Sequence, residues 1–267
     1  VMSAPRIAKE VGRRAFGLDP AGYHGSRPDY PEWVYRTLCS RCGLGRGAAT
    51  FEIGAGTGKA TRRLLDLGTD PLIAVEPDPR LADFLRRNNL DPALKVLVSA
   101  FEDALLDDSA FDLGISATAF HWVEEDAALA KIARLLRPGG WWAALWNVFG
   151  DDGRPDPFHL ATKEMLDGPS SPSAGERGVP FGLDAEARLA ALRRTGAFDI
   201  SDTRTSTWSL VLDADQTVAL YATYSNICVR PDREAVLAEL GRIVRDEFGG
   251  RVVRNMTTSL YIARRAA

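Results

Sequence analysis

Residues 51 to 58 read Phe-Glu-Ile-Gly-Ala-Gly-Thr-Gly, and this stretch decides the fold. A short apolar run leads into it, and a helix is predicted to follow over Lys59–Leu67. Glycine tolerates positive φ angles and has no Cβ, so Gly54, Gly56 and Gly58 allow a sharp turn from strand to helix and let a ligand lie against the main chain. The free N–H groups and partial positive charge of the helix N-terminus suit the carboxylate end of an amino-acid-like ligand.

The spacing of the glycines discriminates between two kinds of cofactor. A dinucleotide fingerprint, G-x-G-x-x-G, would need its third glycine at the position of Lys59. An NAD-dependent dehydrogenase is therefore a distant alternative. Glu76 ends the next apolar run, about 20 residues after the loop. A carboxylate there can accept both hydroxyls of a ribose, and the competing interpretation is a solvated strand end.

Composition narrows the class of protein and its partners. The chain has 267 residues, 45% of them hydrophobic, and a net charge of −3, which fits one sizeable α/β domain with additions. It has no basic run, so we expect no nucleic-acid partner. Its longest apolar runs, such as Trp141–Trp146, are too short to span a bilayer, so we expect no membrane partner. No signal peptide is recognised, so we expect a cytoplasmic location. Cys39 and Cys42 have the spacing of half a zinc site but no second pair, so we expect no metal.

Hydrophobic runs and breakers alternate along the chain as in an α/β fold. Further strands are expected at Lys95–Val98, Asp112–Ser116, Trp141–Val148, Thr205–Leu212 and Arg251–Ala263. Helices are expected at Pro79–Arg87, Glu125–Leu136, Asp184–Arg194, Asp215–Ser225 and Asp232–Phe248, with a short one near Phe158–Leu166. The expected parts are N-terminal cover helices (1–46), a cofactor-binding core (47–149), a loop and helix lid insertion (150–204), and C-terminal strands and helices that complete the sheet (205–267).

Several motifs together resemble the class I S-adenosylmethionine-dependent methyltransferases. E-x-G-x-G-x-G resembles their motif I, and Leu136–Gly140 is similar to the turn before their fifth strand. Ala119-Phe120-His121-Trp122-Val123 is similar to the segment after strand four in the small-molecule branch, the type 11 domain. The resemblance implies a Rossmann-like three-layer sandwich, whose seven-stranded and mostly parallel sheet has an antiparallel last strand. It also implies S-adenosyl-L-methionine as cofactor and a small-molecule methyl acceptor. We expect a monomer or homodimer.

The resemblance assigns roles around the cofactor. Glu52 would orient the methionine end through its ammonium, and Glu76 would bind the ribose. Pro77 and Phe101 would contact the adenine, although Phe101 equally suits an ordinary core position. The full expected set is Glu52, Gly54, Ala55, Gly56, Gly58, Glu76, Pro77, Ala100 and Phe101, with Arg27 and Tyr30 closing over the cofactor carboxylate. For Arg27, a surface ion pair is an almost equally good interpretation.

His121 is the expected catalytic residue, because it lies just past strand four, where the sulfonium methyl should point. A neutral imidazole there is either a general base or a wall of the acceptor pocket, and we favour the wall. The other expected acceptor contacts are Tyr23, Trp122, Trp146, Asn147, Tyr221 and Tyr224. For the last two, core packing is an equally good interpretation.

The function expected from these motifs is transfer of a methyl group to a small organic acceptor by in-line displacement, mostly through proximity. The attacking atom, O, N or C, stays open. Two alternatives also stay open. One is a non-methylating reaction with the same cofactor, and the other is a non-catalytic partner protein that keeps the fold and the cofactor.

Overall fold

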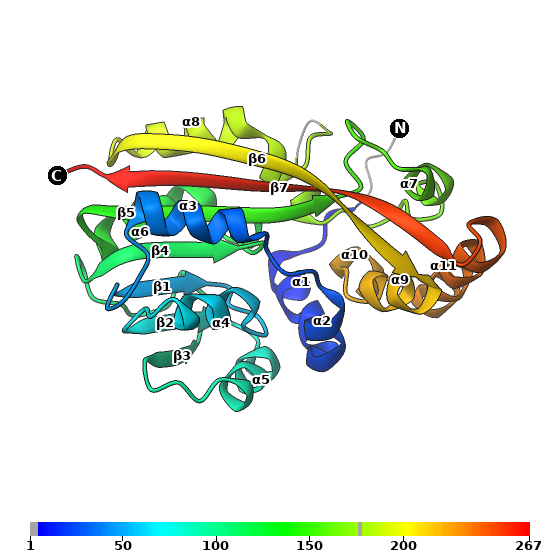
Figure 1. Cartoon of the computed structure of the whole chain (residues 1–267), viewed down its shortest axis with the longest axis horizontal. Coiled ribbons are helices and arrows are strands. Elements are labelled where there is room, and N and C mark those ends of the chain that lie inside the picture. Colours follow the sequence, from blue (N-terminus) through cyan, green and yellow to red (C-terminus); the bar gives the residue numbers. More distant parts are fainter. Residues whose placement is uncertain (1–4, 176–177) are drawn as a thin grey trace.

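The computed structural model describes residues 5–175 and 178–267. Within them one seven-stranded sheet has the order β3-β2-β1-β4-β5-β7-β6 (Figure 1). β7 runs antiparallel to both β5 and β6, while β1 to β5 pair in parallel. This confirms the expected sheet with its antiparallel last strand. The strands are β1 (Thr50–Ile53), β2 (Leu72–Glu76), β3 (Leu94–Val98), β4 (Phe111–Ala117), β5 (Leu136–Phe149), β6 (Phe198–Asp213) and β7 (Arg251–Arg265).

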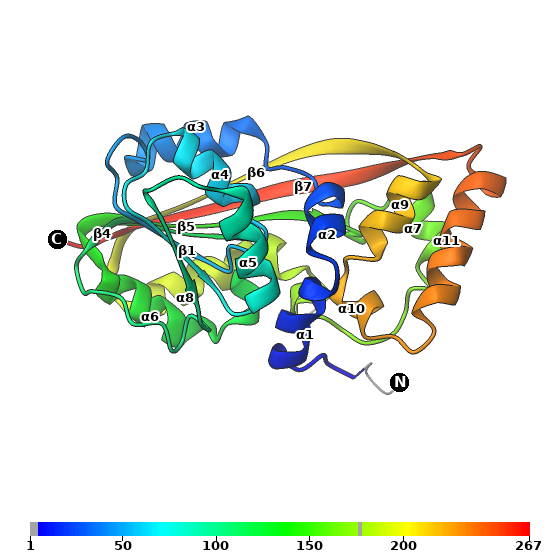
Figure 2. The ribbon, with the colours of Figure 1, turned by 90° about the horizontal axis from the view of Figure 1, so that it is seen from below.

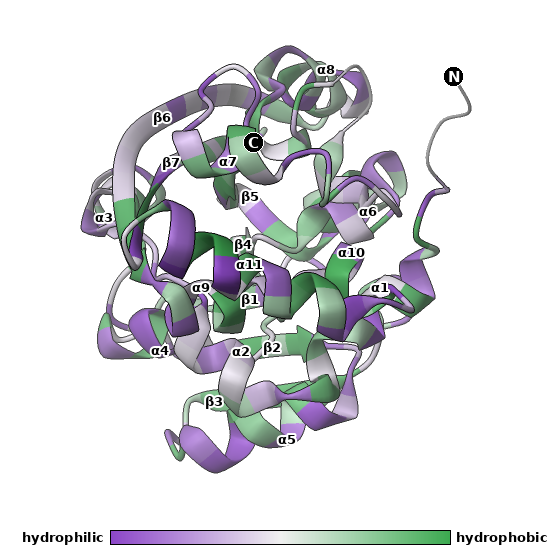
Figure 3. Cartoon of the chain, turned by 90° about the vertical axis from the view of Figure 1, so that its right-hand side faces the viewer, coloured by the Kyte–Doolittle hydropathy of each residue, from purple (hydrophilic) through white to green (hydrophobic). Residues whose placement is uncertain are grey.

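Helices cover both faces of the sheet (Figure 2). On one face lie α3 (Glu32–Cys42), α4 (Lys59–Asp66) and α5 (Pro79–Asn88), and on the other lie α6 (Glu125–Leu135) and α8 (Ala185–Thr195). Every residue of β1 and β2 is buried, as expected for parallel strands covered on both sides. Figure 3 shows this central sheet as mostly hydrophobic and the outer surfaces of α4 and α5 as hydrophilic. Among the described helices, none combines the length and apolarity needed to cross a membrane.

Local capping chemistry explains where several helices begin and end. Asp78 accepts a hydrogen bond from the backbone N–H of Arg80, and Pro79 occupies the first turn of α5. Asp184 caps α8 in the same way through the N–H of Ala187. α5 therefore starts at the expected residue, and α8 starts one residue later than expected, because Asp184 is its N-cap.

Several expected boundaries need correction. β5 begins at Leu136 instead of Trp141, so Leu136–Gly140, expected to be the turn before the strand, belongs to the strand itself. β6 begins at Phe198 instead of Thr205, so the boundary expected between 204 and 205 falls inside a strand. α8 packs against α6 in the sandwich, so it is part of the core layers and does not form a lid. β6 is an edge strand with mostly exposed side chains, and its first half therefore lacks the apolar pattern of a buried strand.

The far ends of β6 and β7 carry a second core, which we call the C-terminal cap. It comprises α9 (Ala214–Tyr221), α10 (Ser225–Cys228) and α11 (Arg233–Glu247), joined by α7 (Pro157–Thr162). The helix expected over Asp215–Ser225 instead ends at Tyr221, and a turn separates it from α10. α1 (Lys9–Ala15) and α2 (Pro20–Ser26) lie between this cap and the main sheet (Figure 1).

Candidate functional site

A cavity of about 690 Å³ lies where the carboxyl ends of the central strands meet α1, α2 and the C-terminal cap. Gly54 follows β1, Glu76 ends β2, Thr118 follows β4, and all three contribute to its wall. Open α/β sheets bind ligands at this edge, and sites for small ligands typically measure about 300–1,000 Å³. The cavity therefore has the place and the size of a ligand site.

The three glycines of the loop adopt left-handed backbone conformations, with φ of 68° at Gly54, 58° at Gly56 and 91° at Gly58. A Cβ on Gly54 would lie 2.4 Å from the Cβ of Ala119, and one on Gly58 would lie 2.3 Å from Cδ1 of Leu85. A Cβ on Gly56 would meet no atom within 4 Å and would project into open space. Gly54 and Gly58 thus permit close packing, whereas Gly56 keeps the cavity wall open.

Glu76 is buried in the cavity wall with both carboxylate oxygens in use. Oε2 accepts the N–H of Gly56 at 2.8 Å, and Oε1 accepts the N–H of Asp78 at 2.9 Å. Burial raises the pKa of Glu76 to about 7. Each carboxylate oxygen has a further lone pair, so ligand hydroxyls can add to these bonds. Pro77 and Phe101 line the same end of the cavity.

Glu52 lies beside a smaller side pocket of about 50 Å³. Its carboxylate is buried and accepts a 2.6 Å hydrogen bond from the hydroxyl of Thr61. Burial raises the pKa of Glu52 to about 8. A buried carboxylate of this kind suits a cationic ligand group, because a positive charge would compensate its ionised form. Ala55 also lines this pocket.

Arg27 and Tyr30 come from the N-terminal segment that covers the site. The guanidinium of Arg27 donates to the carbonyl of Thr223 at 3.0 Å and lies 4.6 Å from the ring centre of Tyr224. It therefore connects the N-terminal segment to the C-terminal cap. The hydroxyl of Tyr30 lies 2.8 Å from that of Thr118, a residue with φ of 56°. Such a φ is an outlier for a β-branched residue and often marks functional sites.

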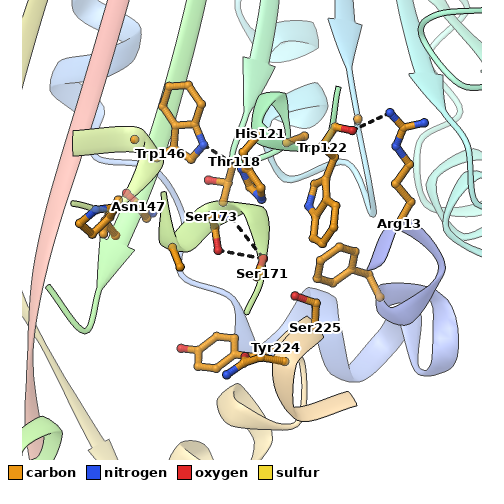
Figure 4. Close-up of a pocket in the computed structure, with 18 of the residues that line it drawn as sticks. Arg13, Thr118, His121, Trp122, Trp146, Asn147, Ser171, Ser173, Tyr224 and Ser225 are labelled. Atoms are coloured by element: carbon orange, nitrogen blue, oxygen red, sulfur yellow. Dashed lines mark hydrogen bonds between the residues drawn. The ribbon is translucent and has the colours of Figure 1, made fainter. Parts of the chain in front are cut away.

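His121 lies on a single turn of 3₁₀ helix, Phe120–Trp122, after β4 (Figure 4). Its Nδ1 accepts the indole N–H of Trp146 at 3.1 Å. A neutral imidazole has one acceptor nitrogen and one donor, so this bond places the proton on Nε2. Burial, together with the charge of Arg27, lowers the pKa of His121 to about 3. The ring is thus a neutral hydrogen-bond donor that lines the cavity.

Aromatic side chains enclose the rest of the cavity. Trp122 and Trp146 lie beside His121, and Figure 4 shows Tyr224 and Ser225 across from them. The ring of Tyr224 stacks on Phe149, and its buried hydroxyl has no hydrogen-bond partner among the described residues. The structure also brings Tyr23, Asn147 and Tyr221 to the cavity wall.

Two of the expected cofactor residues do not reach the main cavity or the side pocket. Ala100 is absent from both walls, and its carbonyl accepts hydrogen bonds from Ser99, Asp103 and Ala104. Gly58 is the N-cap of α4 and packs on Leu85. Both residues shape neighbouring turns without lining the site.

Sequence reasoning missed Arg254 on β7. Its side chain is 1% exposed and forms part of the cavity wall, where its Nε donates to Asp156 at 2.9 Å. Arg254 lies two positions from each of the buried residues Val252 and Met256, which alternate with exposed or half-buried neighbours, so it shares their inward face of the strand. That alternation was the available signal. Within residues 5–175 and 178–267, no group of three or more His, Cys, Asp or Glu side chains could hold a metal ion.

Comparisons with known proteins agree with this geometry. Residues 51–144 match the profile of a family described as "Methyltransferase domain". An uncharacterized methyltransferase of Mycobacterium tuberculosis is 36% identical over 138 residues, which are 50% of this chain and 52% of that protein. The chain spans about half the length of the curated relatives it matches.

Solved structures share the fold. Haemonchus contortus phosphoethanolamine N-methyltransferase 2, solved with phosphomonomethylethanolamine and S-adenosylhomocysteine, has a TM-score of 0.57 at 11% identity, covering 94% of this chain and 58% of that one. The [4+2]-cyclase SpnF has a TM-score of 0.61 at 16% identity, covering 99% of both chains. Residues 51–144 are thus similar to a methyltransferase domain, and the overall fold is shared with these solved structures.

Proposed function

We propose that this protein transfers a methyl group from S-adenosylmethionine to a small organic acceptor bound in the same cavity. The observation that carries the proposal is that one continuous cavity is lined both by the open glycine loop and Glu76 and by the side chains of His121, Trp146 and Tyr224. One ligand can therefore lie against the loop while a second lies against the aromatic side chains.

The residues around the loop fit the cofactor. Glu76 would accept the ribose hydroxyls, and Pro77 and Phe101 would contact the adenine. Gly56 offers main chain without an obstructing side chain. At the side pocket, Glu52 would bind the ammonium of the methionine end, while Arg27 would bind its carboxylate through a bidentate fork.

The bound cofactor supplies a methyl group on a cationic sulfur, and transfer forms a bond from the acceptor atom to that carbon while the S–C electron pair stays on sulfur. The protein's own contribution is to hold the acceptor in line and to exclude water. Positioning can lower the barrier by about 7–11 kcal/mol at best. The Nε2–H of His121 would orient the acceptor by donating a hydrogen bond. An acceptor O–H or N–H would lose its proton to solvent.

A calorimetric titration followed by an acceptor screen tests this proposal. S-adenosylmethionine and S-adenosylhomocysteine should bind, and NAD should not. A panel of small organic acceptors should then include compounds that release S-adenosylhomocysteine. Binding of NAD without binding of either adenosyl compound would refute the proposal. Cofactor binding without release for any acceptor would favour a non-methylating reaction on the same fold.

A further inference from the structure

The guanidinium of Arg254 lies in the cavity wall with one donor group unused. The side chain is 1% exposed, its Nε donates to Asp156 and its Nη1 donates to the hydroxyl of Tyr221. Its Nη2 is buried and has no hydrogen-bond partner among the residues that the structure describes. An unsatisfied buried donor on a charged group is costly, so a group from outside the protein is the expected partner.

A second unused donor lies next to it. Tyr224 is 7% exposed, and its hydroxyl has no partner within the described parts of the chain. Its ring centre is 4.9 Å from that of Tyr221, the residue that accepts from Arg254. Both Tyr224 and Arg254 line the cavity. Two unpaired donors from different parts of the chain therefore lie near each other in the wall of the cavity.

The charges around these donors leave room for a negative ligand. Glu76 and Asp167 are the carboxylates among the described residues that line the cavity. Glu76 belongs to the loop end and is bonded to backbone N–H groups, and Asp167 is exposed. Arg27 shows no carboxylate within ion-pair distance among the described residues. Near Arg254, the one ion-pair partner among the described residues is Asp156, so the wall there carries no excess negative charge.

We propose that the methyl acceptor is an organic carboxylate whose anionic group is held by Nη2 of Arg254 and the hydroxyl of Tyr224. This inference rests on the proposed methyl transfer and names the chemistry of its acceptor. A single negative charge fits better than a phosphate dianion, because Asp156 already neutralises part of the Arg254 charge at 2.9 Å. Arg27 is left for the carboxylate of the cofactor.

Matched pairs of acids and neutral amides test the charge preference directly. The probes are benzoate and benzamide, cinnamate and cinnamamide, and hexanoate and hexanamide, titrated calorimetrically with and without saturating S-adenosylhomocysteine. At least one acid should bind roughly tenfold or more tightly than its amide. Equal binding within every pair, or no binding of any acid, would overturn the inference. Tighter binding of phenyl phosphate than of benzoate would overturn the choice of a carboxylate.

Variants identify the residues responsible. Tyr224→Phe removes a hydroxyl that has no partner in the protein, so it should fold normally while the acid-to-amide affinity ratio falls several-fold. The double variant Arg254→Met with Asp156→Asn removes both buried charges together and should reduce the ratio to near one. Tyr35→Phe, in the separate core under α3, is the matched control and should leave the ratio unchanged.

Unchanged ratios in both site variants would contradict the assignment. A separate titration with S-adenosylhomocysteine distinguishes failure of the methyl-transfer proposal from failure of the carboxylate inference. If the adenosyl ligand does not bind, the methyl-transfer proposal fails whatever the acids do. If it binds and neutral acceptors are methylated as readily as acids, only the carboxylate inference fails.

Discussion

The acceptor nitrogen of the His121 imidazole, Nδ1, is occupied, because it accepts a hydrogen bond from the indole N–H of Trp146, 3.1 Å away. Burial lowers the pKa of His121 to about 3, so the ring is uncharged at neutral pH. Its remaining nitrogen can donate a hydrogen bond but cannot take a proton in this tautomer. The side chain that the sequence offers as a base is therefore better suited to orient an acceptor.

Replacing His121 by phenylalanine keeps an aromatic wall and removes the donor. We expect the KM for the acceptor to rise about tenfold and kcat to fall less than tenfold, with an unchanged pH–rate profile. Steady-state kinetics with an acceptor from the screen would measure both constants. A thousandfold loss of kcat, with unchanged binding of both substrates, would instead establish His121 as a general base.

Glu76 combines two tasks, since the same carboxylate holds the N–H groups of Gly56 and Asp78 and faces the cavity. Glu76→Ala would release both backbone donors and so destabilise the loop as well as the ligand site. Glu76→Gln keeps one acceptor oxygen and should weaken cofactor binding by roughly 1.5–3 kcal/mol with a smaller loss of stability. Calorimetry and thermal melting separate the two effects, and unchanged affinity for the cofactor would refute the ribose role.

The buried carboxyls also make stability depend on pH. Burial raises the pKa of Glu52 to about 8 and that of Glu76 to about 7, above the value of about 4.3 for an unfolded chain. At a pH between its unfolded and its folded pKa, each carboxyl is protonated in the folded protein and ionised in the unfolded chain. The free energy of unfolding should therefore fall as pH rises through this range, by on the order of 1 kcal/mol per pH unit for each group. Urea denaturation from about pH 5 to about pH 8 should show a shallower decline in Glu52→Gln. Glu234→Gln, on an exposed site, is the control, and equal slopes in all three proteins would contradict the argument.

At the scale of elements, the helices and turns whose position depends on neighbouring residues could be predicted from the sequence. The glycine loop, α4 and the capped start of α5 follow from residues within one turn of each other. The early start of β6 could not be predicted, because its exposed edge position removes the hydrophobic signal. The partnership of Arg254 with Asp156 spans 98 residues and depends on tertiary packing.

The glycine loop yields a prediction that separates stability from binding. Gly56→Ala should cost on the order of 1 kcal/mol in stability for its positive φ and should lower cofactor affinity, because the new methyl enters the cavity. Gly54→Ala adds a clash with Ala119 and should cost roughly 1–3 kcal/mol more. Gly249→Ala, with φ of 60° and open space, is the control for strain alone. Equal cofactor affinity in Gly56→Ala and Gly249→Ala would argue against a ligand at the loop.

At the scale of the whole molecule, the site is enclosed by two hydrophobic cores. β6 and β7 run from the main sheet into the C-terminal cap (Figure 1). Residues of both parts line the cavity. Arg27 connects the N-terminal segment to the cap through the carbonyl of Thr223. A ligand that contacts Arg27 therefore touches parts of the chain that are distant in sequence.

Hydrogen exchange should report this enclosure. On binding S-adenosylhomocysteine, amides of the glycine loop, of residues 20–31 and of residues 221–228 should become more protected, because all three segments line the cavity or the side pocket. Ligand at one hundred times its dissociation constant should also add about 2.7 kcal/mol to the free energy of unfolding. The exposed face of α11 lies outside both walls and should change only as far as global stability does. NAD, the control ligand, should protect none of these segments. Protection by S-adenosylhomocysteine that is confined to the glycine loop would mean that the cap does not close on the cofactor and that Arg27 does not bind it.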